Sequence, residues 1–269
     1  MSRKCMSILK SIKRIGLFFV SFLLYSGCIQ SNELNEVVLT AGSYKLLENV
    51  ISAGQNQSTE QKVINATTIL LGTPYNNRTL NMNPLLPERL VIDLKAMDCM
   101  TFIEYSEAFK HADNLEQFSQ HLEKVRYIDA KVAFDSRRHF FTDWSQEHDR
   151  LVDDITSQLS PHTISINKQL NLKENGGKYI SSLDSKSRVI HYIPVRFIDH
   201  RVLSQLKTGD YIGIYSPSSG LDVTHVGIVI RENNKILFRH ASSQHKNFQV
   251  IDTELSQYLK GKEGILVFR

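Results

Sequence analysis

The side chains that nucleophilic catalysis requires are present in this sequence, and the candidate nucleophile is Cys99. It directly follows Asp98, which is a good helix N-cap, and apolar residues recur at helical spacing over residues 102–109. The pattern predicts a helix that begins at Cys99. The helix macrodipole favours a thiolate there by only about 0.3 to 1 kcal/mol, which is less than one pKa unit. A second group must therefore assist ionisation, and an imidazole is the usual one.

Two of the ten histidines lie where a β-hairpin would bring them together. Residues 223–230 and 236–240 are each typical of a strand, and Asn233 and Asn234 between them are typical of a turn. If these two asparagines form a two-residue loop, His225 and His240 lie on one face of the hairpin as diagonal neighbours. A three-residue loop would shift the strand pairing by one residue and place the two histidines on opposite faces.

Together, the three side chains are sufficient for a cysteine hydrolase. Cys99 would be the nucleophile, His225 the general base and later the acid, and His240 the group that holds the His225 ring in the useful tautomer. The alternative role for Cys99 is that of a buried structural cysteine. Paired histidines can also bind zinc, but the sequence has no HExxH, no CxxC and no compact carboxylate cluster nearby. We therefore predict no metal and no other cofactor.

The N-terminal residues have the order of an export signal. Residues 1–27 contain five basic residues, then a ten-residue apolar run that is too short to span a bilayer, and then small residues. The stretch that ends at Cys28 resembles a lipobox and predicts its lipidation, although Tyr25 departs from the pattern and leaves plain secretory cleavage as the alternative. We predict an exported lipoprotein on the periplasmic side of a bacterial membrane. Ile29 after the cysteine is compatible with the outer membrane.

The expected domain organisation and charge follow from this signal. We expect residues 28–58, which are polar, to be the anchor and linker, and residues 59–269 to form one domain. Without residues 1–27 the chain has 27 basic and 28 acidic residues, so it lacks the positive charge that nucleic-acid binding requires. We expect a monomer that is held at the membrane by its lipid anchor and has no nucleic-acid partner.

Other stretches predict elements of this domain. Residues 59–71 and 113–127 show apolar side chains at helical spacing, and Asp113 or Asn114 is the expected N-cap of the second helix. Residues 165–187 are polar and predict a loop.

Several short motifs occur in an order that resembles the NlpC-type papain-like cell-wall hydrolases. They are LGTPY at residues 71–75, DCMTF at 98–102, KTGDYIGIY at 207–215, THVGIVI at 224–230 and RHASS at 239–243. A further block, SRRHFFTDW at 136–144, resembles the N-acetylmuramoyl-L-alanine amidase-like branch of that superfamily. The resemblance implies an α+β, papain-like fold in which a cysteine-bearing helix packs on a central antiparallel β-sheet, with a mainly helical insertion between them. It makes residues 59–269 a papain-like amidase domain.

By this resemblance the substrate is peptidoglycan or its muropeptide fragments. Cys99 would attack the amide between the lactyl group of N-acetylmuramic acid and L-alanine, and His225 would protonate the leaving amine before water hydrolyses the thioester. The backbone N–H of Cys99 would stabilise the oxyanion. Tyr75 of the first motif would lie in the cleft.

We expect six residues to contact the substrate, and Arg137 is the principal one. A guanidinium binds a carboxylate through two hydrogen bonds, and the stem peptide carries carboxylates on D-glutamate and on its third residue. The alternative is that Arg138, His139 and Asp143 are structural, with Asp143 as the ion-pair partner of an arginine. The six residues are Tyr75, Asp98, Ser136, Arg137, Asp143 and Thr224.

Two other functions fit the same residues. The catalytic trio does not encode which amide enters the cleft, so an endopeptidase that cuts within the stem peptide is one alternative. A wall-binding lipoprotein that has lost its activity is the other. The presence of Cys99, His225 and His240 together argues against an inactive protein.

Overall fold

The computed structural model describes residues 37–269. The predicted signal peptide (residues 1–27) and Cys28 lie outside the described residues. In the described part, no helix combines the length and the apolar character needed to cross a membrane. The helices and strands in chain order are β1 (Val37–Leu39), α1 (Ser43–Gly54), α2 (Thr59–Ile69), β2 (Leu90–Ile92), α3 (Cys99–Lys110), α4 (Leu115–Arg126), η1 (Ile128–Ala130), η2 (Phe134–Ser136), α5 (Asp143–Gln146), α6 (Thr156–Leu159), β3 (Ile164–Leu170), β4 (Lys186–Pro194), η3 (Val195–Phe197), α7 (His200–Gln205), β5 (Tyr211–Tyr215), β6 (Val223–Glu232), β7 (Lys235–Ala241), β8 (Val250–Glu254), α8 (Leu255–Tyr258) and β9 (Gly264–Phe268).

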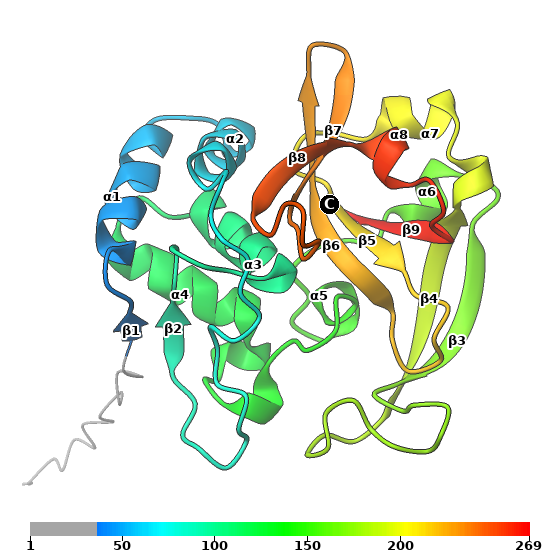
Figure 1. The fold of residues 1–269 in the computed structure, drawn as a ribbon, viewed down its shortest axis with the longest axis horizontal. Coiled ribbons are helices and arrows are strands. Elements are labelled where there is room, and N and C mark those ends of the chain that lie inside the picture. The colour runs from blue at the N-terminus through cyan, green and yellow to red at the C-terminus, as the bar shows by residue number, and fades with distance from the viewer. Residues whose placement is uncertain (1–36) are drawn as a thin grey trace, which may run out of the picture. The chain divides into compact units, whose positions relative to one another are not determined.

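Seven strands form one antiparallel sheet in the order β3-β4-β9-β5-β6-β7-β8. A separate parallel pair joins β1 to β2. Helices α1 to α4 form a group beside the sheet, and α3 packs against β6 and β7 (Figure 1). The protein is therefore of mixed α/β type with a mainly antiparallel sheet and helices, as the sequence predicts at this level.

Buried apolar side chains cover both faces of the sheet. Strand alternation places Tyr211 and Val226 in the core shared with α3, and Ile212 and Val229 in a second core shared with α6, α7 and α8. Burying an aliphatic side chain of this size stabilises the folded state by about 1.5 to 3 kcal/mol. The strands that carry the two histidines are thus held from both sides.

Helix α1 belongs to the folded unit, and this corrects the linker predicted at residues 28–58. Leu47 and Val50 are only 1% and 3% exposed and pack in the same core as α3. The hydroxyl of Ser43 accepts a hydrogen bond from the backbone N–H of Leu94, which ties the start of α1 to the segment after β2. Only one face of α1 is buried, and most residues on its exposed face are polar. The segment as a whole is therefore polar enough to resemble a linker.

The two helices predicted from periodicity are confirmed as α2 and α4. The side chain of Ser58 accepts a hydrogen bond from Gln61 N–H at the start of α2, and Asn114 accepts one from Gln117 N–H at the start of α4. After α4 the chain forms only short turns, namely η1, η2, α5 and α6, before it enters β3. The predicted helical insertion therefore contains one full helix.

Strand β3 corrects the loop predicted at residues 165–187, because the first part of that stretch pairs with β4 along the whole strand. A buried side chain in its middle is Lys168, whose ammonium donates to the backbone carbonyl oxygens of Ser216 and Leu221. A strand that buries a lysine lacks the apolar alternation by which strands are recognised.

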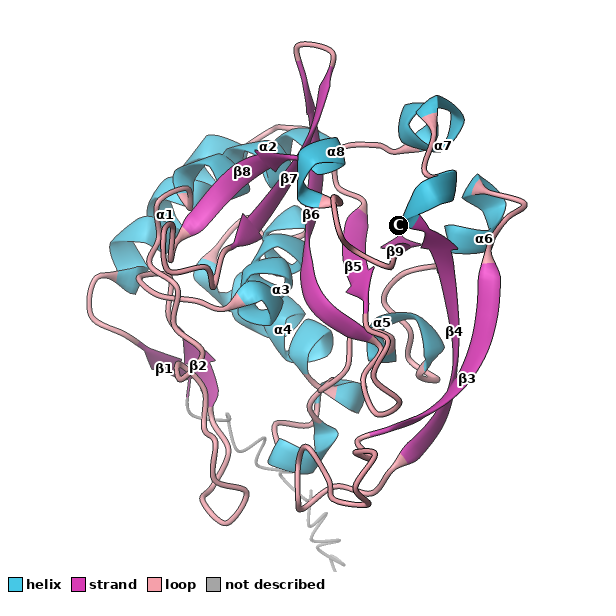
Figure 2. Cartoon of the chain, turned by 45° about the vertical axis from the view of Figure 1, so that its right-hand side comes forward, coloured by secondary structure: helices cyan, strands magenta, loops and turns pink. Residues whose placement is uncertain are grey.

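A two-residue turn joins β6 to β7 and determines where both histidines lie. Asn233 and Asn234 have φ angles of 47° and 63°, left-handed values that asparagine tolerates and that a type I′ turn requires. Glu232 pairs with Lys235, so the register is the predicted one. The strand pairing ends at Ile228, and beyond it β6 and β7 diverge (Figure 2).

Candidate active site

Cys99 is the first residue of α3, and Asp98 fixes this helix start. The Asp98 carboxylate accepts hydrogen bonds from the backbone N–H and the hydroxyl of Thr101, both at 2.8 Å, while the Thr101 hydroxyl accepts one from Asp98 N–H at 2.9 Å. This reciprocal cap occupies the side chain that the sequence analysis expects to contact substrate. Cys99 itself is partly exposed and packs against the core around α3.

The Cys99 thiol lies beside β6 and is protonated in the resting protein. Burial, followed by the Asp98 carboxylate, raises its pKa to about 12, although the backbone N–H groups of Val226, Cys99 and Met100 oppose the shift. The position at a helix start therefore does not by itself produce a thiolate, in agreement with the small size of the dipole effect. A base must remove the proton.

His225 on β6 and His240 on β7 contact each other directly. His225 Nε2 lies 2.8 Å from His240 Nδ1, and the two rings are nearly perpendicular. His240 Nε2 lies 3.4 Å from the hydroxyl oxygen of Thr253 on β8. When each ring carries its proton on Nε2, the hydrogen bonds run in one direction from His225 through His240 to Thr253. Nδ1 of His225 is then the acceptor nitrogen.

Both imidazoles are neutral at physiological pH. Burial, together with the charges of His240 and Lys262, lowers the pKa of His225 to about 3. Burial also lowers the pKa of His240 to about 4, although Asp252 opposes the shift. A neutral imidazole with one nitrogen free of hydrogen is a base, so the pair can accept a proton from a neighbouring acid.

Two tyrosines complete the surroundings of the thiol. Burial, followed by the neighbouring Cys99, raises the pKa of Tyr75 to about 12, and the same two causes raise the pKa of Tyr258 to about 12. The ring centroid of Tyr258 lies 4.9 Å from that of His240 and 6.1 Å from that of His225. The predicted Tyr75 thus lies near the thiol. Sequence reasoning did not find Tyr258, because its one-turn helix α8 shows no recognisable pattern.

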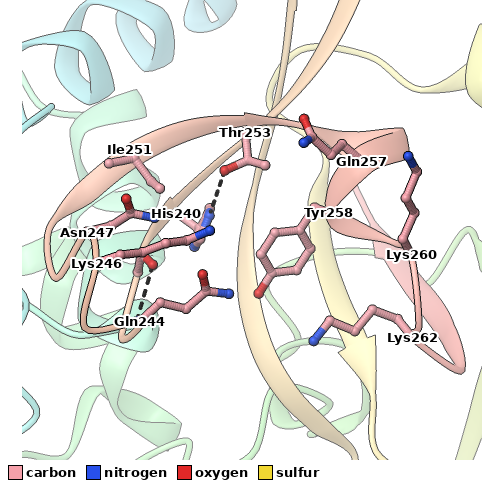
Figure 3. A pocket seen from close by; sticks show the side chains of 11 residues that line it. His240, Gln244, Lys246, Asn247, Ile251, Thr253, Gln257, Tyr258, Lys260 and Lys262 are labelled. Atoms are coloured by element: carbon pink, nitrogen blue, oxygen red, sulfur yellow. Dashed lines mark hydrogen bonds between the residues drawn. The ribbon is translucent and has the colours of Figure 1, made fainter.

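A cavity of about 310 Å³ opens beside His240 and Tyr258. Its lining is polar, and Gln244, Lys246 and Lys262 are among the side chains that surround it (Figure 3). No aspartate or glutamate lines this cavity. Over residues 37–269, no three His, Cys, Asp or Glu side chains are grouped so that they could hold a metal ion.

Residues 65–265 match the model of the AmiA-like, N-acetylmuramoyl-L-alanine amidase-like family. The chain belongs to this family. The matched region of this amidase-like protein includes Cys99, His225 and His240, as well as the cavity beside them. Among curated proteins nothing matches the chain.

Solved structures of other proteins resemble this amidase-like chain. An N-acetylmuramoyl-L-alanine amidase from Bacteroides uniformis is 27% identical, with a TM-score of 0.61, and the match covers 84% of this chain and 98% of the other. A Bacteroides fragilis protein assigned provisionally as a xylanase is 29% identical, with a TM-score of 0.59, over 76% and 98%. A Legionella pneumophila protein with a TM-score of 0.71 over 83% and 92% is 20% identical and shows the likeness of fold alone.

Arg137 of this amidase-like protein has a different partner from the one predicted. Its Nη2 lies 2.5 and 2.7 Å from the two carboxylate oxygens of Glu88, and its Nε lies 2.8 Å from one of them. Together with Phe134 and Tyr179 it lines a separate cavity. In the structure the guanidinium is thus engaged in an internal ion pair, and its contact with a substrate carboxylate stays a prediction.

Asp143 is also structural. It is 1% exposed and accepts hydrogen bonds from Arg188 at 2.6 Å and from Lys186 at 3.2 Å. An arginine partner was the alternative drawn from the sequence, but Arg188 comes from β4 and not from the SRRHFFTDW block. Within that block Arg138 pairs instead with Asp149 at 2.7 Å.

The aromatic residues of the block lie in the core, and the last two predicted contacts, Ser136 and Thr224, lie elsewhere. Phe141 and Trp144 are 1% and 0% exposed and belong to the core shared with α3. Ser136 ends the turn η2, where its hydroxyl lies 3.5 Å from the neighbouring Asp135 carboxylate. Thr224 is exposed directly before His225, at an irregularity in the pairing of β5 and β6. In the described structure, no residue of the SRRHFFTDW block is therefore found at the candidate centre of Cys99, His225 and His240.

Proposed function

We propose that the protein is a cysteine-dependent N-acetylmuramoyl-L-alanine amidase of papain-like type. It would cleave the amide between the lactyl group of N-acetylmuramic acid and the first L-alanine of the peptidoglycan stem peptide. Membership of the amidase-like family and the likeness to the Bacteroides uniformis amidase support an amidase-like function. The observation that carries the cysteine mechanism is the position of Cys99 at the start of α3, beside β6 and its neutral His225–His240 pair.

The first step transfers one proton and forms one bond. His225 takes the Cys99 thiol proton on Nδ1, while its Nε2–H continues to donate to His240 Nδ1, and the sulfur attacks the carbonyl carbon of the lactyl group. Because the thiol starts protonated, proton transfer accompanies the attack. His240 holds the ring of His225 in the tautomer whose Nδ1 is the base.

The second step breaks the amide bond. The tetrahedral intermediate carries its negative charge on the former carbonyl oxygen, which the backbone N–H of Cys99 at the start of α3 stabilises. His225 passes its proton to the L-alanine nitrogen, the carbon–nitrogen bond breaks, and the peptide leaves as a free amine. A thioester joins Cys99 to the lactyl group. Water then gives a proton to His225 and attacks the thioester, which releases the carboxylic acid and restores the thiol.

A glycosidase is the other enzyme class that the comparisons raise, through the protein assigned provisionally as a xylanase. Glycosidases use two carboxyl groups that flank the scissile bond. The cavity beside His240 is lined by no aspartate or glutamate, and the Asp98 carboxylate is occupied by the cap of α3. These observations favour acyl transfer over glycoside hydrolysis at this centre.

Defined muropeptides test this proposal. The purified protein is incubated with them, the products are identified by mass spectrometry, and Cys99→Ala is run beside Met100→Ala as a control on the same helix. We expect release of an intact stem peptide that begins with L-alanine, loss of this product in Cys99→Ala, and its retention in Met100→Ala. A truncated stem peptide would instead indicate the endopeptidase, and no product from the folded wild-type protein would indicate a wall-binding protein.

We also propose that the enzyme is an exported monomer with a lipid anchor on Cys28, on the periplasmic side of the outer membrane. The signal-like order of residues 1–27 and the lipobox-like stretch before Cys28 support this. Membrane fractionation of the wild-type protein and Cys28→Ser tests it. We expect the variant to move from the membrane to the periplasmic fraction, and an unchanged distribution would contradict the anchor.

A further inference from the structure

The cavity beside the histidine pair is positively charged. Lys246, Lys260 and Lys262 line it, and no carboxylate does. In the described part of the chain none of these three lysines forms an ion pair. The cavity therefore presents cations that residues 37–269 leave without an ion-pair partner.

Two of these lysines extend toward the interior of the cavity. In Figure 3 the chains of Lys246 and Lys262 approach it from opposite sides, with the side chains of Gln244 and Tyr258 between them. The Lys262 ammonium lies 5.5 Å from the ring centroid of Tyr258, and its charge is close enough to lower the pKa of His225. The two ammonium groups thus flank the histidine end of the candidate centre, with amide and hydroxyl groups beside them.

Two arginines that could also bind a carboxylate are neutralised by carboxylates of the protein, one beside His240 and one in the separate cavity at Phe134. Arg239, which directly precedes His240 on β7, binds both carboxylate oxygens of Asp252 at 2.7 Å. Arg137, the residue expected from the sequence to read a substrate carboxylate, is bound to Glu88. The positive charge available to a ligand is therefore on the lysines of the cavity.

The proposed chemistry indicates which part of the substrate lies there. His225 protonates the leaving amine, so the peptide that leaves lies on the imidazole side of the centre. The cavity is lined by His240, the hydrogen-bond partner of His225. The residue after L-alanine in the stem peptide is D-glutamate, which carries one free carboxylate unless it is amidated, and a second one where the peptide ends at this residue.

We infer that Lys246 and Lys262 bind carboxylates of the leaving peptide, so that the protein selects acidic stem peptides over amidated ones. This inference rests on the proposed amidase function and adds the charge of the substrate to it. Each solvent-exposed ammonium–carboxylate contact contributes about 1.4- to 5-fold in affinity, so the two lysines together give a preference of about 2- to 25-fold.

Two substrates with the same scissile bond test the inference. They are N-acetylmuramoyl-L-alanyl-D-glutamate and its diamide, and kcat/KM is measured for the wild-type protein, the double variant Lys246→Met/Lys262→Met and the control Lys235→Met. Lys235 lies on the same hairpin, at its exposed turn. We expect the wild type and the control to prefer the dicarboxylate by about 2- to 25-fold, to the same extent in both. We expect the double variant to lose this preference, so that its kcat/KM is about the same for the dicarboxylate and the diamide.

A binding measurement separates this inference from the amidase proposal. Calorimetric titration of Cys99→Ala protein with the same two compounds, with and without the two lysine substitutions, needs no turnover. If the wild type cleaves neither compound but the lysines still account for tighter binding of the dicarboxylate, the amidase proposal fails and the carboxylate site stands. Equal binding of the two compounds, or a preference that persists in the double lysine variant, overturns the inference whether or not hydrolysis occurs.

Discussion

Acidification should destabilise this protein through its buried histidine pair. The pKa of His225 is lowered from 6.5 to about 3 and that of His240 from 6.5 to about 4. The folded state therefore favours the neutral imidazoles, and protons bind more readily to the unfolded chain. The stability that these groups contribute is complete above pH 6.5 and is lost as the pH falls toward about 4. For each histidine the loss between pH 7 and pH 5 is about 2 kcal/mol.

The variant His240→Asn isolates one half of this effect. It removes one titrating ring and retains a side chain that can hydrogen-bond to His225. The free energy of unfolding is measured in urea at pH 7 and pH 5, followed by the fluorescence of Trp144, the single tryptophan, which is fully buried. We expect the difference between the two pH values to be about 2 kcal/mol smaller in the variant than in the wild type. Comparing the pH 7 to pH 5 differences removes any effect of the substitution on the free energy of unfolding that does not depend on pH.

The matched control is His200→Asn, which removes an exposed histidine at the start of α7. This substitution leaves the buried His225–His240 pair unchanged, so the variant serves as the reference for the pH dependence that the pair causes. The reasoning is refuted if His240→Asn keeps the full wild-type difference, because the proton affinity of His240 would then be the same in both states.

Three further predictions follow from named contacts. Alkylation of Cys99 by iodoacetamide should be slow at neutral pH and faster at alkaline pH, because the raised pKa of about 12 keeps the thiol protonated. The labelled fraction is measured by mass spectrometry. Rapid labelling at a rate that is constant below pH 7 would instead reveal a thiolate–imidazolium pair. Asp98→Ala removes the cap of α3 and should lower the free energy of unfolding by about 1 to 2 kcal/mol in a denaturant titration, so an unchanged midpoint would contradict the cap. Glu88→Gln leaves the guanidinium of Arg137 buried without its counter-ion and should lower the free energy of unfolding by about 3 kcal/mol in the same assay. A gain in activity with no loss of stability would instead support Arg137 as a substrate-binding residue.

The parts of the candidate site that are encoded locally could be predicted from the sequence. Asp98 precedes the apolar periodicity of α3 directly, so the helix start and the place of Cys99 follow from neighbouring residues. The Asn233–Asn234 turn fixes the hairpin register within a few residues. The contact between the two histidines could therefore be derived without knowledge of the rest of the fold.

Contacts between distant segments could not be predicted in this way. Arg137 is bound by Glu88, which lies 49 residues away on another segment, and no local pattern marks that pair. Tyr258 reaches the centre from a single helical turn near the end of the chain. A buried polar side chain can also prevent a strand from being recognised in the sequence. Strand β3 is the example, because Lys168 is one of its inward-facing residues. In each case the partner is chosen by tertiary packing, which sequence periodicity does not record.

The hairpin that carries both histidines gives the two halves of the centre different folding requirements. Only 15 residues separate His225 from His240, and β-hairpins form in about 1 to 10 μs. Cys99 joins them only when α3 docks on β6 and β7, a contact between segments far apart in the chain. A molecule whose sheet has formed but whose α3 is not docked has the proposed acid–base pair in place without the proposed nucleophile. We therefore expect recovery of activity during refolding to report the docking of the helical layer, after the sheet has formed.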